Sequence, residues 1–219
     1  MRILHGKQVV DTPPDWRERI AATGRPVIVD LGAGDGRYAY ECARTDPESL
    51  YIAVDPDAET LADYAFRASR KPARGGVANA VFVVAAAEGL PSELRGLADR
   101  VRVNFPWGSL LRGLLQPQPD ILTVVMALLL PGGVLEIIMS YDPANDPNAF
   151  AGDPLPAFDA GYLEASLVPA YEAAGIVCTG HRRLTQDEAL AVPSTWGRRL
   201  LHARPRDVYF LACVPAYEL

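Results

Sequence analysis

Short apolar runs alternate with helical patterns along most of this chain, and this alternation restricts the possible folds more than any other feature. Parallel strands need long crossover connections, and helices in those connections cover both faces of the sheet. We therefore predict an α/β fold with a mostly parallel sheet and right-handed crossovers. The runs predicted as strands are PVIVDLG, LYIAVDP, AVFVVAA, DRVRVNFP and GGVLEIIMS.

Further elements precede, interrupt and follow this series. The first residues, MRILHGKQVVDT, alternate apolar and polar side chains, which predicts a β-hairpin over 1–12. The chain has no internal repeat and no long linker, so we expect a single domain over 1–219. The remaining predictions are helices near 36–45, 57–70, 119–129 and 161–174, a turn near 91–96, a strand near 176–184, a short helical turn and a last strand, DVYFLACV.

Length and composition exclude several classes of protein. A chain of 219 residues with 49% hydrophobic content can bury a large core. The longest apolar run, ILTVVMALLL, has about ten residues and stops at Pro131, too short to span a bilayer, and no apolar targeting segment opens the chain. Cys42, Cys178 and Cys213 are odd in number and far apart, which leaves neither a disulfide framework nor a zinc site. We expect a cytoplasmic protein without metal or membrane contact.

The net charge of −6 argues, taken alone, against a nucleic-acid partner, because phosphate binding needs a positive surface. The charge is unevenly spread. Segment 141–160 is acidic and rich in proline, which predicts an irregular insertion between the fifth strand and the next helix. Two other stretches are basic, and the simplest interpretation of either is a solvated face. The acids are Asp142, Asp146, Asp153 and Asp159, and the basic residues are Arg67, Arg70, Lys71, Arg74, Arg198, Arg199, Arg204 and Arg206.

A glycine-rich turn, VDLGAGDGR at 29–37, follows the first predicted strand. Its spacing, Gly-x-Gly-x-Gly, leaves the dinucleotide fingerprint incomplete, yet such a turn lets a ligand approach the backbone at the carboxyl edge of the sheet. Asp30, Asp55 and Glu88 lie at the ends of three successive strands. A lone acid usually caps a helix or faces solvent. Three at one edge are placed to meet an ammonium group, the hydroxyls of a ribose and an adenine.

The stretch NFPWGSLLR at 104–112 ends the fourth predicted strand with a Pro-Trp pair. It is either a plain strand-to-helix turn or a platform for a flat substrate. A tryptophan more often belongs to a core. Here Pro106 restrains a neighbour and a glycine follows both Trp107 and Trp196, and the preference for the platform rests mostly on the family resemblance given below.

Together, the glycine turn and the three acids resemble those of class I S-adenosylmethionine-dependent methyltransferases, over most of the chain. The resemblance implies a Rossmann-like sheet of seven strands in the order 3-2-1-4-5-7-6, with strand 7 antiparallel and helices on both faces, and S-adenosyl-L-methionine as cofactor. The cofactor-binding residues that it implies are Asp30, Gly32, Ala33, Gly34, Asp55, Pro56, Ala87, Glu88, Asn104 and Ser109.

A closer similarity lies in FPWGSLLRG and the downstream STWGRRLLHAR, which resemble motifs of aminoglycoside-resistance methyltransferases of the kanamycin-apramycin type. Those enzymes act on N1 of an adenine in the decoding site of 16S rRNA, in the 30S subunit. The resemblance implies that Trp107 and Trp196 close on a flipped adenine and that Ser194 holds the segment of Trp196. It places Phe105 and Pro106 in the same site and assigns the basic stretches to the RNA backbone. We expect a monomer, although the sequence does not give the oligomeric state.

The chemistry of this reaction agrees with the residues present. N1 of neutral adenine carries an in-plane lone pair, so its attack on a sulfonium methyl group needs no general base. His5, His181 and His202 indeed lie in segments without an acidic or nucleophilic partner nearby. The reaction needs an extruded base, alignment, and tolerance of the positive charge that develops on the ring.

Two other classes of function stay open from the sequence. One is a class I methyltransferase that acts on tRNA or a small molecule, which needs only the cofactor residues. The other is a weakly active or degenerate homologue that binds cofactor or RNA without turnover. The acidic segment 141–160 keeps this second class open, because the corresponding connection in the resembled family often carries a basic residue.

Overall fold

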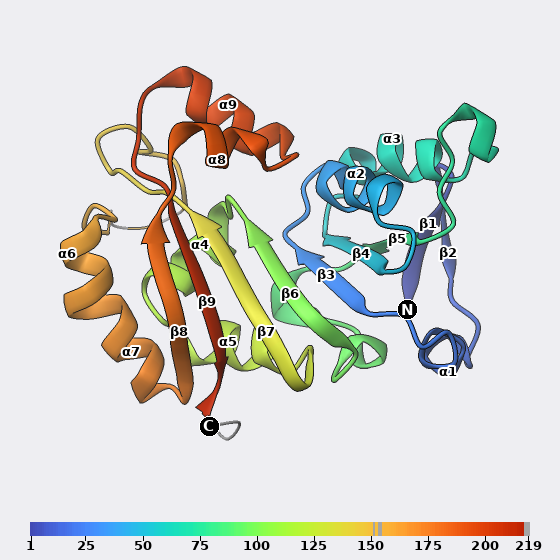
Figure 1. Ribbon diagram of the computed structural model, residues 1–219, viewed down its shortest axis with the longest axis horizontal. Coiled ribbons are helices and arrows are strands. Elements are labelled where there is room, and N and C mark those ends of the chain that lie inside the picture. Colours follow the sequence, from blue (N-terminus) through green and yellow to red (C-terminus); the bar gives the residue numbers. More distant parts are fainter. Residues whose placement is uncertain (151, 153–154, 217–219) are drawn as a thin grey trace.

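One mixed β-sheet organises the computed structural model, which describes residues 1–150, 152 and 155–216 (Figure 1). The strands of the described chain are β1 Arg2–His5, β2 Gln8–Asp11, β3 Val27–Leu31, β4 Leu50–Asp55, β5 Ala80–Val84, β6 Ala98–Asn104, β7 Leu129–Met139, β8 Ile176–Arg183 and β9 Tyr209–Pro215. Their spatial order is β2-β1-β5-β4-β3-β6-β7-β9-β8. Because β3 pairs in parallel with both β4 and β6, the strand order reverses at the centre of the sheet.

The predicted count of seven strands is wrong, because the N-terminal hairpin joins the sheet and makes nine strands among the described residues. The other seven, β5-β4-β3-β6-β7-β9-β8, keep the predicted order 3-2-1-4-5-7-6. β1 pairs antiparallel with β2 and, at Ile3 and Val83, with β5. The hairpin thereby covers backbone groups that β5 would otherwise expose at an edge. The alternating pattern of 1–12 indicates a hairpin but does not say which strand it meets. β9, the last strand, is antiparallel to both of its neighbours, β7 and β8.

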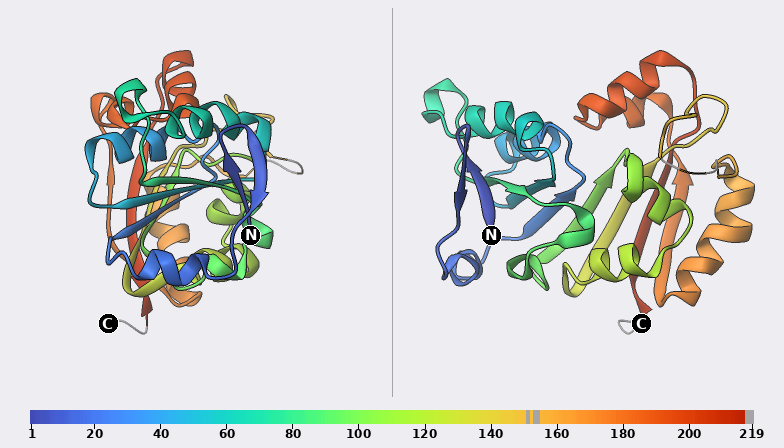
Figure 2. Two further views of the ribbon diagram at one scale, coloured as in Figure 1. Left: turned by 90° about the vertical axis from the view of Figure 1, so that its right-hand side faces the viewer. Right: turned by 180° about the vertical axis from the view of Figure 1, so that it is seen from behind.

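Helices cover both faces of this sheet (Figures 1 and 2). Their bounds are α1 Trp16–Ala21, α2 Arg37–Thr45, α3 Ala58–Ala68, α4 Gly108–Leu115, α5 Pro119–Met126, α6 Ala160–Tyr162, α7 Val168–Ala173, α8 Gln186–Ala191 and α9 Thr195–Ala203. α2 and α3 lie on one face, whereas α4 and α5 lie on the opposite face, behind β6 and β7 in Figure 1. α8 and α9 lie above the carboxyl ends of the strands, across a gap from α2 and α3.

Helix α4 has no counterpart among the predicted elements, although its apolar pattern is present in the sequence. Its two pairs of adjacent leucines, Leu110 with Leu111 and Leu114 with Leu115, are all buried on one side. Two glycines in GSLLRGLL lower the intrinsic helix propensity, and the packing of the leucine face outweighs that loss. The short helical turn expected before the last strand is two helices, α8 and α9, and α1 also lies outside the predicted elements.

Three apolar clusters hold these layers together. The largest lies between the sheet and the α4, α5 and α7 side, and a second lies under α2 and α3. A third, smaller cluster fixes α8 and α9 above the strand ends, and its members include Phe105, Ile138, Leu184, Leu200, Leu201 and Val208. Within the described ranges, no helix combines the length and apolar character needed to cross a membrane.

Leu4 tests the attachment of the hairpin. Its side chain is 7% exposed and packs into the cluster under α2 and α3. Leu4→Ala should therefore lower the free energy of unfolding by about 2–4 kcal/mol. Val9, in the same hairpin, is 44% exposed, so Val9→Ala should change it by less than about 0.5 kcal/mol. Urea denaturation of both variants measures this, and equal losses would contradict the described packing.

Candidate functional site

A cavity of about 430 Å³ opens at the carboxyl ends of β3, β4, β5 and β6. Ligands bind at this edge in open α/β sheets, where the strand order reverses. Every residue predicted at the cofactor lies in its wall: Asp30, Gly32, Ala33, Gly34, Asp55, Pro56, Ala87, Glu88, Asn104 and Ser109. Of the residues predicted at the adenine, Phe105, Trp107, Ser194 and Trp196 line the same cavity, whereas Pro106 is buried and is not part of the lining.

The glycine turn between β3 and α2 shapes one wall of this cavity. Gly34 has a φ of 58° and no atom within 4 Å of where its Cβ would be, so the backbone at Gly34 is open to a ligand. The Asp55 carboxylate stabilises the turn, because its Oδ2 accepts a hydrogen bond from the Gly34 N–H at 2.8 Å. Its Oδ1 accepts another from the Asp57 N–H at 3.0 Å. Burial raises the pKa of Asp55, and these two hydrogen bonds oppose that rise.

Asp30 is the most deeply buried acid in the cavity wall. Its side chain is 2% exposed, and its Oδ1 accepts a hydrogen bond from Asn104 Nδ2 at 3.0 Å. The other carboxylate oxygen and the Asn104 Oδ1 have no hydrogen-bond partner among the described residues. Burial raises the pKa of Asp30 to about 7, against the hydrogen bond from Asn104 and the charge of Arg102. Two buried acceptors without partners suit the amino group of an amino acid, which supplies donors and a positive charge.

Trp107 and Trp196 contact each other in the wall of the cavity. Their ring centroids are 5.0 Å apart and their planes meet at 73°, an edge-to-face arrangement. This packing leaves no flat slot between the two indoles, so a base can lie between them only after the rings separate. The Trp196 Nε1 is buried without a hydrogen-bond partner among the described residues, which leaves a donor available at this position.

A tight contact joins the segments that carry the two indoles. Phe105 has a φ of 51°, in the left-handed region that non-glycine residues rarely adopt. Its ring lies against Gly197, where a Cβ would be 2.4 Å from Phe105 Cε2. Ser194 caps α9, since its Oγ accepts a hydrogen bond from the Gly197 N–H at 3.0 Å. The end of β6 and the start of α9 are therefore held in one arrangement.

The structure does not support the predicted RNA contact of Arg206. Its guanidinium makes two hydrogen bonds to the Asp146 carboxylate, at 2.9 and 3.0 Å, and the two side chains are 6% and 3% exposed. Arg204 donates a hydrogen bond to Asn145. Segment 141–150 therefore neutralises part of the second basic stretch, which local sequence patterns cannot reveal. Asp153 lies outside the described residues.

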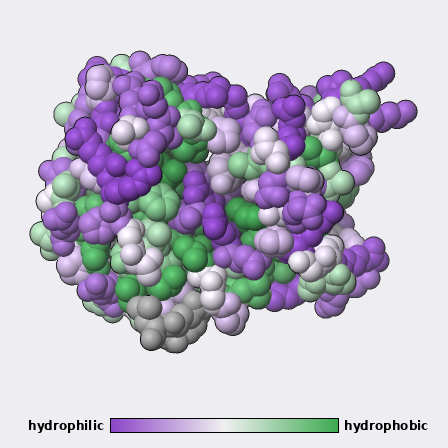
Figure 3. Space-filling model, in the orientation of Figure 1, coloured by the Kyte–Doolittle hydropathy of each residue, from purple (hydrophilic) through white to green (hydrophobic). Residues whose placement is uncertain are grey.

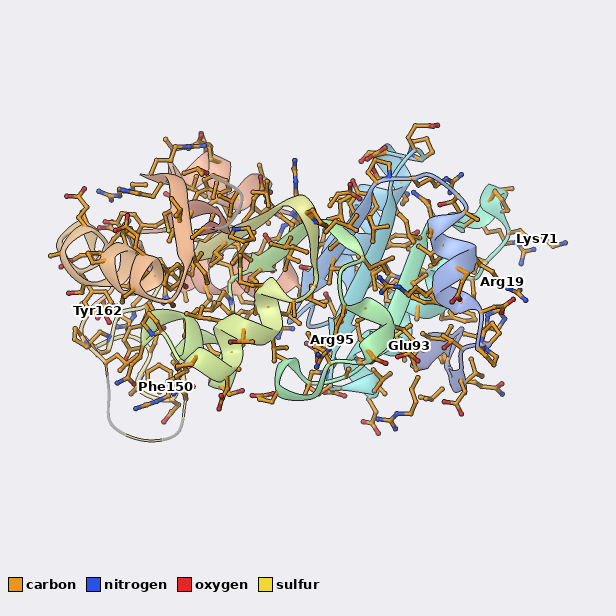
Figure 4. The ribbon with its side chains drawn as sticks, turned by 90° about the horizontal axis from the view of Figure 1, so that it is seen from below. Arg19, Lys71, Glu93, Arg95, Phe150 and Tyr162 are labelled. Carbon is orange, nitrogen blue, oxygen red and sulfur yellow. The ribbon has the colours of Figure 1, made fainter. Side chains whose placement is uncertain are left out.

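The other basic residues are exposed on two sides of the cavity. Arg67 lies in the last turn of α3, Arg70, Lys71 and Arg74 follow that helix, and Arg198 and Arg199 lie on α9. Lys71 projects from one end of the molecule in Figure 4, and Figure 3 shows hydrophilic surface over both regions. Arg199 also lines the cavity, whereas the four residues near α3 do not.

The cavity contains polar residues that sequence reasoning missed. They are Asp35, Tyr38, Thr60 and Thr195. Thr195 stands between two predicted residues, Ser194 and Trp196, so its position in the sequence indicates that it belongs to the same site. Tyr38 and Thr60 lie on helices, and only the packing of α2 and α3 against the sheet turns them toward the cavity.

Comparison with known proteins assigns this arrangement to a family. The family described as 16S rRNA (adenine(1408)-N(1))-methyltransferase matches residues 2–214. The chain belongs to this family. A family member of that name from Escherichia coli is 34% identical over 213 residues, which cover 95% of this chain and 96% of the relative. Another, from Streptoalloteichus hindustanus, is 32% identical and covers 94% of each chain.

Solved structures of family members share the fold. A W203A mutant of the 16S rRNA (adenine(1408)-N(1))-methyltransferase from Catenulisporales acidiphilia, with the cosubstrate SAM, is similar with a TM-score of 0.86 and 33% identity, over 98% of this chain and 96% of that one. The 16S rRNA methyltransferase KamB is similar with a TM-score of 0.86 and 32% identity, over 98% of this chain and all of that one. The methyltransferase architecture is therefore established for this family member.

Gly197 tests the contact between the two indole segments. Gly197→Ala should displace the start of α9, because the strained backbone at Phe105 gives its ring little room to retreat. We expect a loss of about 1–3 kcal/mol in the free energy of unfolding and a change in tryptophan fluorescence. Gly180→Ala is the control, since no atom lies within 4 Å of a Cβ there. Identical urea denaturation curves and emission spectra for the two variants would contradict the described contact.

Proposed function

We propose that this family member transfers the methyl group of S-adenosylmethionine to N1 of adenine 1408 in 16S rRNA, within the 30S subunit, and thereby confers resistance to aminoglycosides. The observation that carries this proposal is the family match over residues 2–214, on a chain whose cavity holds the glycine turn, the acids and both indoles. Such an enzyme works in the cytoplasm, and we propose that it acts there as a single-domain monomer.

The cavity residues divide into groups that would hold the cofactor. The free oxygen of Asp30 suits the amino group, and Asp55 stands where a carboxylate accepts the hydroxyls of a ribose. Glu88 bounds the side assigned to the adenine. S-adenosylmethionine would supply a methyl group on a sulfonium sulfur, which leaves as a neutral thioether when the methyl group is transferred. The chain therefore has to bind, orient and exclude water.

The indoles supply what the target base needs. An adenine extruded from RNA loses its neighbours, and an aromatic platform returns roughly 1–3 kcal/mol of stacking per base. The rings also favour the positive charge that develops on the adenine, by about 0.5–2 kcal/mol. Trp107 and Trp196 lie in the same cavity as the cofactor residues, so separation of the two rings would align the base with the methyl group.

A transfer assay tests the proposed function. Tritium from labelled S-adenosylmethionine should pass to 30S subunits, and primer extension on the product should stop at adenine 1408. Transfer RNA and free nucleosides under the same conditions separate this activity from other class I methyltransferases. Absence of transfer to 30S subunits, with S-adenosylmethionine binding intact, would reject the proposal in favour of a binding protein without turnover.

Gly34 tests the cofactor assignment. Gly34→Val places a branched side chain in the cavity and should weaken S-adenosylmethionine binding at least about tenfold, on the order of 1.4 kcal/mol. Gly24→Val is the matched control, because Gly24 also has a positive φ, 63°, and no atom near its Cβ position, but lies outside the cavity. Both variants carry the same backbone strain, so equal affinities by calorimetry would contradict the assignment.

Trp107 and Trp196 test the platform. Replacing either with Ala should slow methyl transfer far more than it weakens binding to the subunit, since misalignment of about 1 Å can cost on the order of a hundredfold in rate. Phe should be milder, because it keeps a ring face. A purely structural indole would instead cost about 3–5 kcal/mol of stability. Single-turnover rates, melting curves and cofactor affinity distinguish the two roles.

The exposed basic residues test the RNA surface, from which Arg206 is now omitted. The pair Arg70→Glu and Arg74→Glu should weaken 30S binding and flatten its dependence on log salt by roughly 1.5–2. The control pair Arg19→Glu and Arg95→Glu makes the same charge change away from both basic stretches: Arg19 lies on α1, at the amino ends of the strands (Figure 1), Arg95 precedes β6, and neither lines the cavity. Equal affinities for the two double variants would contradict the proposed surface.

A further inference from the structure

Three charged side chains, Asp30, Arg102 and Glu136, lie side by side on adjacent strands at the centre of the sheet. Of these three, only Asp30 lines the cavity. Arg102 on β6 is the register partner of Asp30 on β3 and of Glu136 on β7. Register partners project to the same face of a sheet. Arg102 therefore lies between an acid that faces the cofactor site and an acid that does not line it.

Contacts fix Arg102 on both of its sides. Its Nη1 donates a hydrogen bond to Glu136 Oε2, on the side away from Asp30, and the two side chains are only 15% and 14% exposed. Its guanidinium also lies over the ring of Tyr38, 5.6 Å from the centroid. Tyr38 lines the cavity beside Asp30. Arg102 thus supports a cavity residue without entering the cavity.

The charge of Arg102 acts on Asp30, whose environment otherwise opposes ionisation. Burial raises the pKa of Asp30 to about 7, and the nearby acids Asp55 and Asp35 add to that rise. The hydrogen bond from Asn104 and the charge of Arg102 oppose it. The other titratable groups coupled to Asp30 are Tyr38 and Cys42 on α2, and the pKa of each lies above its usual range because of burial. Arg102 is therefore a cation whose charge favours the ionised form of Asp30.

We propose that Arg102, anchored by Glu136, is a positioning residue that keeps the Asp30 carboxylate charged and the Tyr38 ring in place for a cationic amino group of the cofactor. The inference rests on the proposed function only in taking S-adenosylmethionine as the ligand. It assigns a role to a charged pair outside the cavity, and it makes cofactor affinity depend on pH through a residue that does not touch the cofactor.

The sign of the effect follows from the row of charges. Removal of the positive charge at Arg102 raises the pKa of Asp30 further, so a smaller fraction of the carboxyl group is ionised near neutral pH. A rise of about one unit would weaken binding about tenfold at pH 6 and less than about twofold at pH 8.5. A purely structural role of Arg102 predicts a loss that does not vary with pH. Titration of the ligand's own amino group affects all variants alike and cancels in their ratio.

The variants separate a loss of charge at Arg102 from a loss of folding. Arg102→Met alone would leave the mostly buried Glu136 with only its longer contact to Arg100, whereas replacing both Arg102 and Glu136 with Met exchanges a mostly buried ion pair for apolar side chains, which is often tolerated. Arg102→Lys keeps the charge and should keep the pH profile. Arg100→Met is the matched control, because Arg100 lies on the same strand and also pairs with Glu136, at 3.5 Å, but its side chain is 52% exposed.

Calorimetric titration with S-adenosylmethionine from pH 6 to 8.5 decides the proposal, together with carboxyl-carbon NMR of the ligand-free protein, in which Asp30→Asn identifies the Asp30 signal. In the double Met variant, we expect the pH midpoint of cofactor affinity and the NMR titration midpoint of Asp30 to lie at a higher pH than in the parent. Arg100→Met should match the parent in both. If Asp30→Asn abolishes binding but the titration midpoint of the Asp30 carboxyl group is the same in the parent and in the double variant, the inference is overturned. Unchanged affinity in Asp30→Asn would reject the cofactor assignment itself and, with it, this inference.

Discussion

The parallel pairing of β3 with β6 is the constraint on which the rest of this structure depends. β4 and β5 lie on one side of β3, and β6 and β7 lie on the other, so the connections leave this pair of strands in opposite directions. No crossover helix can cover the point where they part, and a crevice remains at the carboxyl edge. Asp30, one residue before the end of β3, and Asn104, the last residue of β6, share a hydrogen bond of 3.0 Å in the wall of the cavity.

Burial of charge explains two features that the overall composition obscures. The net charge of −6 suggests a protein that repels RNA, yet the charge of Asp146 is neutralised inside the molecule by its ion pair with Arg206. Breaking such a pair on one side typically costs about 3–5 kcal/mol, so segment 141–150 and the segment before β9 are bound to each other. The acidic insertion therefore acts in part as a brace. Asp30 differs from Asp146, because one of its buried carboxylate oxygens has no hydrogen-bond partner among the described residues. Burial of this unpaired oxygen destabilises the fold until a ligand with hydrogen-bond donors binds.

The two indoles occupy a strained and closely packed corner of the site. Phe105 holds a positive φ, its ring fills the space above Gly197, and Trp107 and Trp196 meet edge to face. Strained backbone of this kind persists only where surrounding packing enforces it, and it concentrates at functional sites. The arrangement presents two aromatic rings to the cavity while their supporting segments stay fixed. A base that enters between them has to move side chains, and the Phe105 contact can remain.

The sequence by itself determined the features that arise from local patterns. Apolar runs and helical periodicity predicted the strands of the α/β fold. The glycine turn, the strand-end acids and the Pro-Trp-Gly and Thr-Trp-Gly motifs, with the family resemblance that they carry, predicted most residues of one cavity. These signals are local because each depends on neighbours within a few positions. The tertiary structure alone decided that the hairpin joins β5, that Asp146 removes Arg206 from the surface, and that Arg102 stands between Asp30 and Glu136. Each of these depends on which distant segments pair and on how deeply a charge is buried, and no local pattern carries that information.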